Sequence, residues 1–388
     1  MAYAEGRTFF DADSHIMELP GFLSDFADPA VRELLPPFSV TSGGPMAERM
    51  VGYVERGGHA ADKIAMLELD IIGGAKNYEA LGAFNSKERS RALDLLGFHA
   101  QWVFSTFSPD QILPAKDLDT KYAACRAHNR AMASFCADDP RLLPVAFLSL
   151  DDPQRAAREL DVAIEMGCGG VWIPAAPCGG RSPGHGDLDP IWARMAEAGV
   201  PFLLHVGGQR IQIRNEYMNN GRPAPKDWLG GAENVRSKDI TVLHQAAEEF
   251  LSVLVLDGVL ERHPQLRGGA IELGATWVPG MVRRLDHAAS IWSRSEPELK
   301  NFIRPPSQQL RDQLAFTPYP FEDVGALIRD SYPELYLFSS DYPHTEGGRN
   351  PIGRFEASLG DLPESVRSQF YSENFAKLVP SVRSLSLT

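Results

Sequence analysis

Cysteine is scarce in this chain, and its spacing excludes the sites that cysteines usually build. Four cysteines occur among 388 residues, and no two of them stand in the CxxC spacing of zinc or redox sites. A chain of this length can bury a large apolar core, so it does not depend on a disulfide framework. We therefore expect buried, unreactive thiols and a cytoplasmic protein.

Long apolar runs and excess positive charge are missing as well. No window reaches the roughly 18 apolar residues of a membrane span, and the start MAYAEGRTFFDADSH lacks a secretory apolar region. Lysine and arginine number 38 against 51 acidic residues, which gives a net charge of −13. This balance argues against a nucleic-acid or anionic-membrane partner. We expect a small-molecule substrate.

Short apolar, β-rich runs alternate with longer helical patterns, which is typical of a parallel α/β fold. The runs that predict strands are Phe9–Asp13, Gln101–Thr106, Leu143–Leu150, Gly170–Ala175, Pro201–Val206, Arg267–Leu273, Gln313–Pro318 and Leu335–Ser340. Eight parallel strands close a (β/α)8 TIM barrel. We predict one barrel domain over residues 1–388, with insertions after strands one and five (Asp25 to Gly97 and Gly207 to Asp239) at the active-site mouth.

Helix signals lie between these strands. One pattern begins at Asp152 and ends at Gly167, and another begins at Asp189 and ends at Gly199. The apolar stretch VLHQAAEEFLSVLVLDGVLERHP is long enough to favour a buried helix over a strand.

Groups that can bind a metal stand at the ends of three predicted strands. In FFDADSH, Asp11, Asp13 and His15 recur at every second position, which places them on one face of a strand. His205 closes PFLLH, and Asp341 follows LYLFSS. A lone aspartate at a strand end more often caps a helix, and a lone histidine is often a core residue. Here, however, the ends of strands one, five and eight meet at one barrel mouth.

Imidazole together with carboxylate suits Zn²⁺, Mn²⁺ or Fe²⁺, of which we expect zinc first. Water bound to such an ion has its pKa lowered toward about 7 and becomes a nucleophile at neutral pH. We therefore expect a divalent ion at these strand ends, with Asp11, Asp13, His15, His205 and Asp341 as its candidate ligands.

The ordered phrases DADSHIME, FLLHVGG, RHPQLRGGAIELGATW and LFSSDYPH resemble the amidohydrolase-related branch of the metal-dependent hydrolase superfamily. That branch contains aminocarboxymuconate semialdehyde decarboxylase and resorcylate-type decarboxylases, besides hydrolases. The resemblance runs from about Phe9 to about Phe375. It implies a TIM barrel, often dimeric, in which Asp13 and His15 hold the place of the first-strand signature. It also assigns His205 and Asp341 as the fifth- and eighth-strand ligands.

One position departs from this pattern. The decarboxylases carry a catalytic histidine at the end of strand six, and Glu272 stands there in this chain. Three interpretations stay open: a general base on bound water, a ligand to a second metal together with Glu18, or a carboxylate that orients a ligand. Glu18 is also a candidate ligand of the first metal, with a surface or helix-start role as its alternative.

Other candidates surround this set. We expect Asp341 to shuttle a proton as well as bind metal, and His344 to orient Asp341, touch substrate, or make only a loop hydrogen bond. Arginines of the second insertion can bind an acidic substrate through paired hydrogen bonds, unless they are solvated: Arg210, Arg214 and Arg222, near Tyr217. Trp277, Trp172 and Phe316 are candidates for an aromatic pocket wall, and core packing is the alternative.

These observations lead to a ranked set of functions. We expect a metal-dependent hydrolase of a C–N, C–O or C–C bond in a small organic acid or aromatic compound, working as a homodimer. The first alternative is a nonoxidative decarboxylase of an aromatic or muconate-type acid, in second place because Glu272 replaces the histidine. A dinuclear-metal oxygenase, resembling isobutylamine N-hydroxylases, comes third. A barrel without catalysis comes last.

Overall fold

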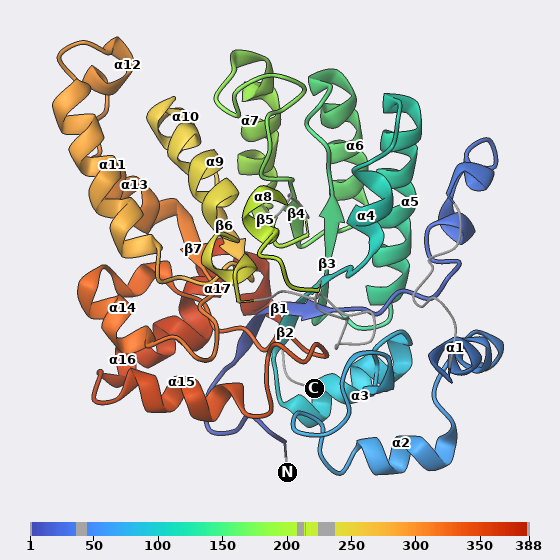
Figure 1. The fold of residues 1–388 in the computed structure, drawn as a ribbon. Helices are drawn as coiled ribbons and strands as arrows, with labels where there is room; N and C mark the ends of the chain where they lie inside the picture. Colours follow the sequence, from blue (N-terminus) through green and yellow to red (C-terminus); the bar gives the residue numbers. More distant parts are fainter. Residues whose placement is uncertain (1, 36–44, 208–212, 214, 224–236, 386–388) are drawn as a thin grey trace.

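Seven parallel strands form one sheet in the part of the chain that the structure describes. The structure is a computed structural model, and it describes all residues except 1, 36–44, 208–212, 214, 224–236 and 386–388 (Figure 1). The strands follow one another in sequence order. They are β1 (Phe10–His15), β2 (Ala100–Phe104), β3 (Leu142–Phe147), β4 (Gly170–Trp172), β5 (Phe202–His205), β6 (Gly268–Ile271) and β7 (Leu314–Phe316). Each overlaps a predicted run.

The predicted eighth strand, Leu335–Ser340, is not a strand, but its backbone joins the two edges of the sheet. Isolated parallel bridges pair Tyr336 with Phe316 of β7 and Tyr342 with Ser14 of β1. Backbone hydrogen bonds run from Leu337 N to Phe316 O (2.9 Å) and from Asp341 N to Asp13 O (2.9 Å). The sheet is therefore curled so strongly that one short segment connects its first and last strands.

Helices cover the outside of the curled sheet (Figure 1). The α-helices are α1 (Pro45–Arg56), α2 (Ala61–Leu67), α3 (Ser86–Leu96), α4 (Ser108–Ile112), α5 (Leu118–Cys136), α6 (Pro153–Glu165), α7 (Asp189–Ala198), α8 (Asn215–Met218), α9 (Gln245–Leu256), α10 (Val259–Arg262), α11 (Val278–Trp292), α12 (Pro297–Lys300), α13 (Pro306–Gln313), α14 (Val324–Asp330), α15 (Pro351–Leu359), α16 (Glu364–Ser368) and α17 (Asn374–Leu378). Within the described ranges, none is long and apolar enough to span a membrane.

Local sequence explains the helix boundaries that were predicted. The Asp152 side chain accepts hydrogen bonds from the first amides of α6, and Gly199 ends α7 in the left-handed conformation with φ of 66°. The long apolar stretch is helical, as α9 and α10, with Gly258 at a φ of 74° between them.

Two insertions interrupt the strand–helix alternation where the sequence predicts them. Residues 16–99 separate β1 from β2 and contain α1, α2 and α3, which lie at the lower right of Figure 1. Residues 206–244 follow β5 and include α8. Both insertions leave the C-terminal ends of their strands, so they lie on the side of the sheet where the predicted ligands stand.

The interior of the curled sheet is packed with side chains from successive strands. One buried cluster contains Phe104, Phe147, Trp172, Leu203, Ile271, Ala315 and Leu337, which come from β2 to β7 and the connecting segment. The alternate residues of the same strands, such as Val171 and Leu204, belong to a second cluster with the helices. The interior is a solid core, so polar groups can gather only at the ends of the strands.

Candidate metal centre

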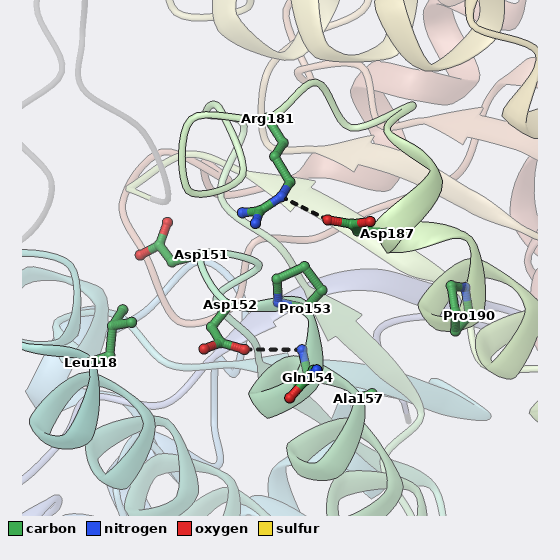
Figure 2. A pocket seen from close by; sticks show the side chains of 9 residues that line it. All are labelled: Leu118, Asp151, Asp152, Pro153, Gln154, Ala157, Arg181, Asp187 and Pro190. Atoms are coloured by element: carbon green, nitrogen blue, oxygen red, sulfur yellow. Dashed lines mark hydrogen bonds and ion pairs between the residues drawn. The ribbon is translucent and has the colours of Figure 1, made fainter.

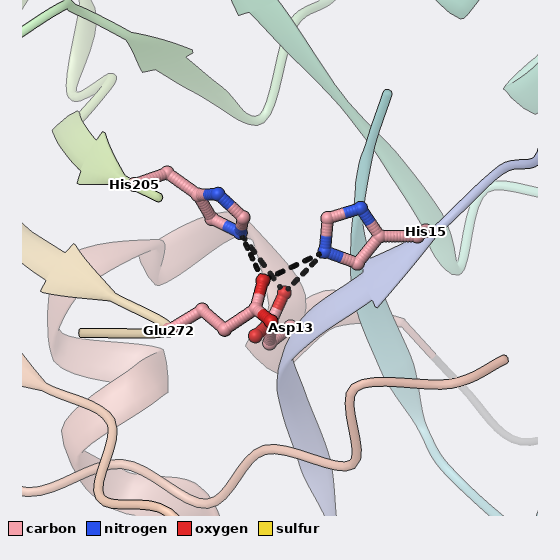
Figure 3. Close-up of side chains that lie close together, drawn as sticks. All are labelled: Asp13, His15, His205 and Glu272. Carbon is pink, nitrogen blue, oxygen red and sulfur yellow. Dashed lines mark hydrogen bonds and ion pairs between the residues drawn. The ribbon is translucent and has the colours of Figure 1, made fainter. Parts of the chain in front are cut away.

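Donor groups from four predicted positions meet at the C-terminal ends of β1, β5 and β6. Asp13, His15, His205 and Glu272 each offer a donor atom within 4.8 Å of the others, and all four are buried. His15 Nε2 lies 3.2 Å from Asp13 Oδ1 and 3.4 Å from Glu272 Oε2. His205 Nε2 lies 3.4 Å and 3.3 Å from the same two oxygens. Figure 3 shows the four side chains converging on one point.

Asp341 belongs to a second, overlapping group. This group consists of His15, Glu272, Asp341 and His344, again within 4.8 Å of one another and buried. Asp341 Oδ1 lies 3.8 Å from His15 Nε2 and 3.0 Å from His344 Nδ1. The structure thus brings together Asp13, His15, His205 and Asp341, and it places Glu272 between the two groups.

The two histidines of the first group both turn Nε2 toward the centre. The Val206 carbonyl oxygen can only accept, so His205 Nδ1, 2.8 Å away, carries the ring hydrogen and Nε2 keeps its lone pair. Burial, with the nearby charge of His344, lowers the pKa of His15 to about 3, so its imidazole is neutral at physiological pH. His15 Nε2 is buried and makes no hydrogen bond within the described residues. Neutral imidazoles with inward lone pairs are metal ligands.

Glu272 and Asp341 share an uncommon backbone conformation. Their φ angles are 54° and 52°, in the left-handed region that side chains other than glycine and asparagine seldom adopt. Two hydrogen bonds hold the Glu272 backbone: its N–H donates to Thr317 Oγ1 (2.8 Å), and Tyr319 Oη donates to its carbonyl oxygen (2.9 Å). Glu272 directly follows β6, and Asp341 follows the segment that connects β7 to β1; such strain is typical of functional sites.

Asp11 does not share a face with Asp13 and His15, contrary to the period-two prediction. Asp11 pairs with Gln101 of β2, whereas His15 pairs with Phe104, so an extra residue on β1 shifts the register between them. A β-bulge of this kind reverses which side chains face inward. Asp11 instead accepts hydrogen bonds from Ser340 N (2.7 Å) and Ser340 Oγ (2.6 Å). It therefore fixes the residue before Asp341.

The spacing of the first donor group fits a metal ion. Metal bonds of about 2.0–2.2 Å put neighbouring ligands of a tetrahedral ion about 3.4 Å apart. The four distances between histidine Nε2 atoms and carboxylate oxygens in this group lie between 3.2 and 3.4 Å. A cation between these side chains would offset the charges of Asp13 and Glu272, two carboxylates that are costly to bury. Compared with the predicted set, Glu272 takes the place of Asp341 in this group.

Glu18 is placed in neither donor group. Its Oε1 accepts hydrogen bonds from Phe107 N, Ser108 N and Ser108 Oγ, each at 2.9 Å, and its Oε2 accepts one from Thr106 N (3.0 Å). These bonds fasten the first insertion to the loop after β2. These contacts indicate a structural role for Glu18. Its carboxylate oxygens do not lie in either donor group, as the prediction of a metal ligand would require.

Glu18→Gln provides a test of this assignment. The amide offers one acceptor oxygen where the carboxylate offers two, so buried donors lose their partner, at a cost of about 2–3 kcal/mol. We expect a lower midpoint in urea unfolding and an unchanged metal content per folded chain. A loss of metal at unchanged stability would show that Glu18 is a ligand after all.

The predicted substrate-binding residues have different outcomes. Arg210 and Arg214 lie outside the described residues, whereas Arg222 and Tyr217 are exposed, Tyr217 by 71 %. Trp277 is buried, donates from Nε1 to Gly274 O (2.8 Å) and packs against Phe316 in the outer core. Trp172 lies nearer to the centre, with its ring 4.8 Å from that of His205.

The structure adds residues that the sequence did not single out. Thr106 Oγ1, two residues beyond β2, donates to Ile16 O (2.7 Å) and lies 3.0 Å from His344 Nε2. Arg89 of α3 is fully buried, donates to the carbonyl oxygen of His15 and lies over the ring of Tyr342. The strand-end rule that identified His205 also applies to Thr106. No sequence pattern places Arg89, which arrives from the first insertion.

Lys76 is a third unpredicted residue near the centre. Its Nζ is buried without a hydrogen bond to any described residue. Burial lowers the pKa of Lys76 to about 8, although the carboxylates of Asp341 and Glu346 act in the opposite direction. The next residue, Asn77, donates its N–H to Pro343 O (2.9 Å), so this part of the insertion is fastened to the loop after Asp341. Glu346 lines a small cavity together with Asp13, Glu272 and Asp341.

A second pocket, over the N-terminus of α6, lacks such a donor group (Figure 2). Its carboxylates are already paired. Asp152 caps α6, Asp187 pairs with Arg181 (3.2 Å), and Asp151 pairs with Lys121 (2.7 Å). The metal centre therefore remains the candidate active site.

Comparisons with known proteins agree with this centre. The family model described as Amidohydrolase matches residues 105–380. The decarboxylase orsB of Emericella nidulans is 27% identical over 234 residues, which are 58% of this chain and 66% of that protein. The chain thus spans just under two thirds of that relative.

Two solved structures share the fold over nearly the whole chain. The amidohydrolase map2389c from Mycobacterium avium subsp. paratuberculosis K-10 has a TM-score of 0.74 at 23% identity, covering 97% of this chain and 100% of its own. The 5-carboxyvanillate decarboxylase from Novosphingobium aromaticivorans, complexed with manganese and 4-hydroxy-3-methoxy-5-nitrobenzoic acid, has a TM-score of 0.62 at 16% identity, covering 97% and 96%. The curled sheet matches the TIM-barrel structures of this family, and from the family model this chain belongs to the amidohydrolases.

Proposed function

We propose that the protein is a metal-dependent, nonoxidative decarboxylase of an aromatic carboxylic acid. The observation that carries the proposal is the buried group of Asp13, His15, His205 and Glu272, in a chain whose relatives include named decarboxylases. The sequence ranked hydrolysis first, and the relatives favour decarboxylation. In this proposal Leu335–Ser340 holds the position of the eighth barrel strand, and the enzyme is the homodimer expected from the sequence.

The residues of the centre divide into two tasks. Asp13, His15, His205 and Glu272 would hold a divalent ion, and we propose manganese ahead of zinc because solved relatives contain manganese. When bound, the ion supplies positive charge that fixes the substrate's carboxylate and neighbouring oxygen. As the carbon–carbon bond breaks, CO₂ leaves and the electron pair remains on the ring carbon.

A proton must then reach that carbon. Asp341 Oδ1 and His344 Nδ1 lie 3.0 Å apart and can hold one proton between them. Burial raises the pKa of Asp341 to about 6, so a minor fraction of this carboxyl group is protonated near neutral pH. The replaced strand-six histidine therefore has a substitute on the other side of the centre, in His344.

Hydrolysis is the second candidate, and Glu272 is the observation that favours it. A carboxylate at this position can take a proton from bound water, whereas decarboxylation needs an acid rather than a base. A decarboxylase acts on benzoates, whereas a hydrolase of this kind acts on amides or esters. An assay that offers both kinds of substrate therefore separates the two functions.

The assay compares benzoates with amides and esters. Manganese-loaded protein would be incubated with 2,6-dihydroxybenzoate, 5-carboxyvanillate and related ortho-hydroxybenzoates, and CO₂ and the decarboxylated phenol would be quantified. We expect stoichiometric release of both from at least one acid. Turnover of aryl amides or esters without CO₂ release from any benzoate would reverse the ranking.

Lys76 supplies a prediction about substrate binding. A buried ammonium that has no acceptor among the described residues is suited to hold a substrate carboxylate or phenolate. In Lys76→Met we expect KM to rise on the order of 10- to 100-fold with unchanged or higher thermal stability, since a hydrogen bond to a charged group contributes about 1.5–3 kcal/mol. Steady-state kinetics and thermal unfolding measure both quantities.

Lys121→Met is the matched control, because Lys121 already pairs with Asp151 (2.7 Å). Its KM should equal that of the wild type. An unchanged KM in Lys76→Met would remove Lys76 from the substrate site.

A further inference from the structure

We infer that Arg89 is a positioning residue that holds two backbone segments of the metal centre in alignment, and this inference rests on the centre of the proposed function. The guanidinium of Arg89 contacts both segments at once. Its Nη2 donates to the carbonyl oxygen of His15, the proposed ligand at the end of β1. Its Cζ lies 5.2 Å from the ring centroid of Tyr342, the residue after Asp341.

The two segments carry different parts of the centre. Asp13 and His15 belong to β1, whereas Asp341 and His344 belong to the loop that follows residue 340. Backbone bonds already pair the segments, from His15 N to Tyr342 O (2.7 Å) and from Asp341 N to Asp13 O (2.9 Å). Arg89 adds a tie from α3, an element that belongs to neither segment. Its contacts can therefore set how the ligand at β1 is aligned with the loop that carries Asp341.

The backbone of Arg89 is itself held firmly at the start of α3. The Asn85 side chain caps the helix by accepting from Glu88 N (2.9 Å). The Glu88 carboxylate accepts from His59 N (2.7 Å) and Gly82 N (3.3 Å). Gly82, with φ of 72°, lies so near that a Cβ there would stand 2.4 Å from Arg89 Cα. The guanidinium thus reaches the centre from a rigid base.

Stability alone does not explain an arginine at this position. Arg89 is fully buried, and its Nε and Nη1 donate to no residue that the structure describes. Burying a cation whose hydrogens lack acceptors costs free energy, and an apolar side chain of similar volume is often neutral or stabilising in its place. What arginine offers here is a planar fork that can donate to a carbonyl oxygen while it lies on an aromatic face.

Other bonds of the first insertion each reach one of the two segments. They run from Met17 N to Ala83 O (2.7 Å), from Tyr78 Oη to Glu18 O (2.6 Å), from Asn77 N to Pro343 O (2.9 Å) and from Tyr342 Oη to Leu81 O (2.6 Å). Because these bonds remain when Arg89 is replaced, we expect its variants to keep the insertion docked and to lose only the alignment of the two segments.

The test uses Mn²⁺ alone, so it does not depend on the substrate. Full-length Arg89→Met and Arg89→Lys would be stripped with a chelator and titrated with Mn²⁺ in a calorimeter, well below their unfolding temperatures. We expect the Kd of Mn²⁺ to rise on the order of 10-fold in Arg89→Met, as for other groups that orient metal ligands. In Arg89→Lys the rise should be smaller, because an ammonium keeps the charge without the planar fork. The paramagnetic resonance lines of bound Mn²⁺ should broaden in both variants.

Arg141→Met is the matched control. Arg141 directly precedes β3 and pairs with Asp139 (2.7 Å) and Asp94 (2.8 Å), outside both donor groups. This variant should lose stability and keep the wild-type Kd of Mn²⁺. A double-mutant cycle adds a second readout: the effects of Arg89→Met and Tyr342→Leu on Kd should combine to less than their product, because each removes the same contact.

Folded Arg89 variants that bind Mn²⁺ with the wild-type Kd, and differ from the wild type only in lower stability, would overturn the inference and leave the proposed function intact. A wild-type protein that binds no Mn²⁺ would overturn both. If Arg89→Met does not fold, the same comparison of Kd in Arg89→Lys decides.

Discussion

Replacing His205 by alanine is expected to reduce kcat/KM by about 10³-fold or more, which corresponds to about 4 kcal/mol of lost transition-state stabilisation. His205 Nε2 lies between Asp13 and Glu272, and its ring is oriented by Val206 O. Alanine leaves two carboxylates and one imidazole, which bind a divalent ion less tightly and in no fixed geometry. Steady-state kinetics and metal analysis on the same preparation would measure the effect.

His128→Gln is the matched control for this variant. His128 is equally buried, on α5, where it contacts Ser105 and Asn129 outside both donor groups. We expect this control to lower stability and to keep its metal. If His205→Ala kept wild-type metal content and activity, the centre would not be the active site.

Replacing Glu272 by glutamine is expected to weaken metal binding and to lower kcat/KM on the order of 10²- to 10³-fold. Glutamine has nearly the same shape and meets the same backbone strain, so the fold should persist. It removes one negative charge from a site where His15 and His205 lie 3.4 and 3.3 Å from Oε2. Metal titration and kinetics separate the loss of affinity from the loss of turnover.

Glu346→Gln serves as the control, since Glu346 lines the same cavity without belonging to a donor group. If Glu272→Gln bound metal as tightly as Glu346→Gln and differed from the wild type only in lower stability, the role of Glu272 would be structural.

The convergence of Asp13, His15, His205 and Asp341 was predictable because one rule governs it. Parallel strands in a curled sheet bring their C-terminal ends to one side, and each of these residues ends a strand or follows one. The sequence also indicates both insertions and most helix ends, because glycine, aspartate and proline mark them locally. The family was recognisable from the order of these phrases along the chain.

The finer geometry was not predictable from local sequence. The Asp11 side chain does not lie on the predicted face, because the register of β1 shifts between Asp11 and Ser14. This shift depends on how β1 pairs with β2. The membership of Glu272 in the first donor group depends on a left-handed turn at a non-glycine residue. Lys76 and Arg89 belong to the first insertion. The sequence of this insertion has no periodic pattern that predicts how it folds. In each case the position of the side chain depends on tertiary contacts, which the alternation pattern of a strand does not predict.

The most direct test of the proposed centre is a crystal structure of the manganese-soaked protein, with anomalous data collected at the manganese edge. The account predicts a strong anomalous peak within about 2.0–2.3 Å of donor atoms from Asp13, His15, His205 and Glu272. A map with no peak at these four side chains, or with manganese bound only elsewhere on the chain, would contradict it.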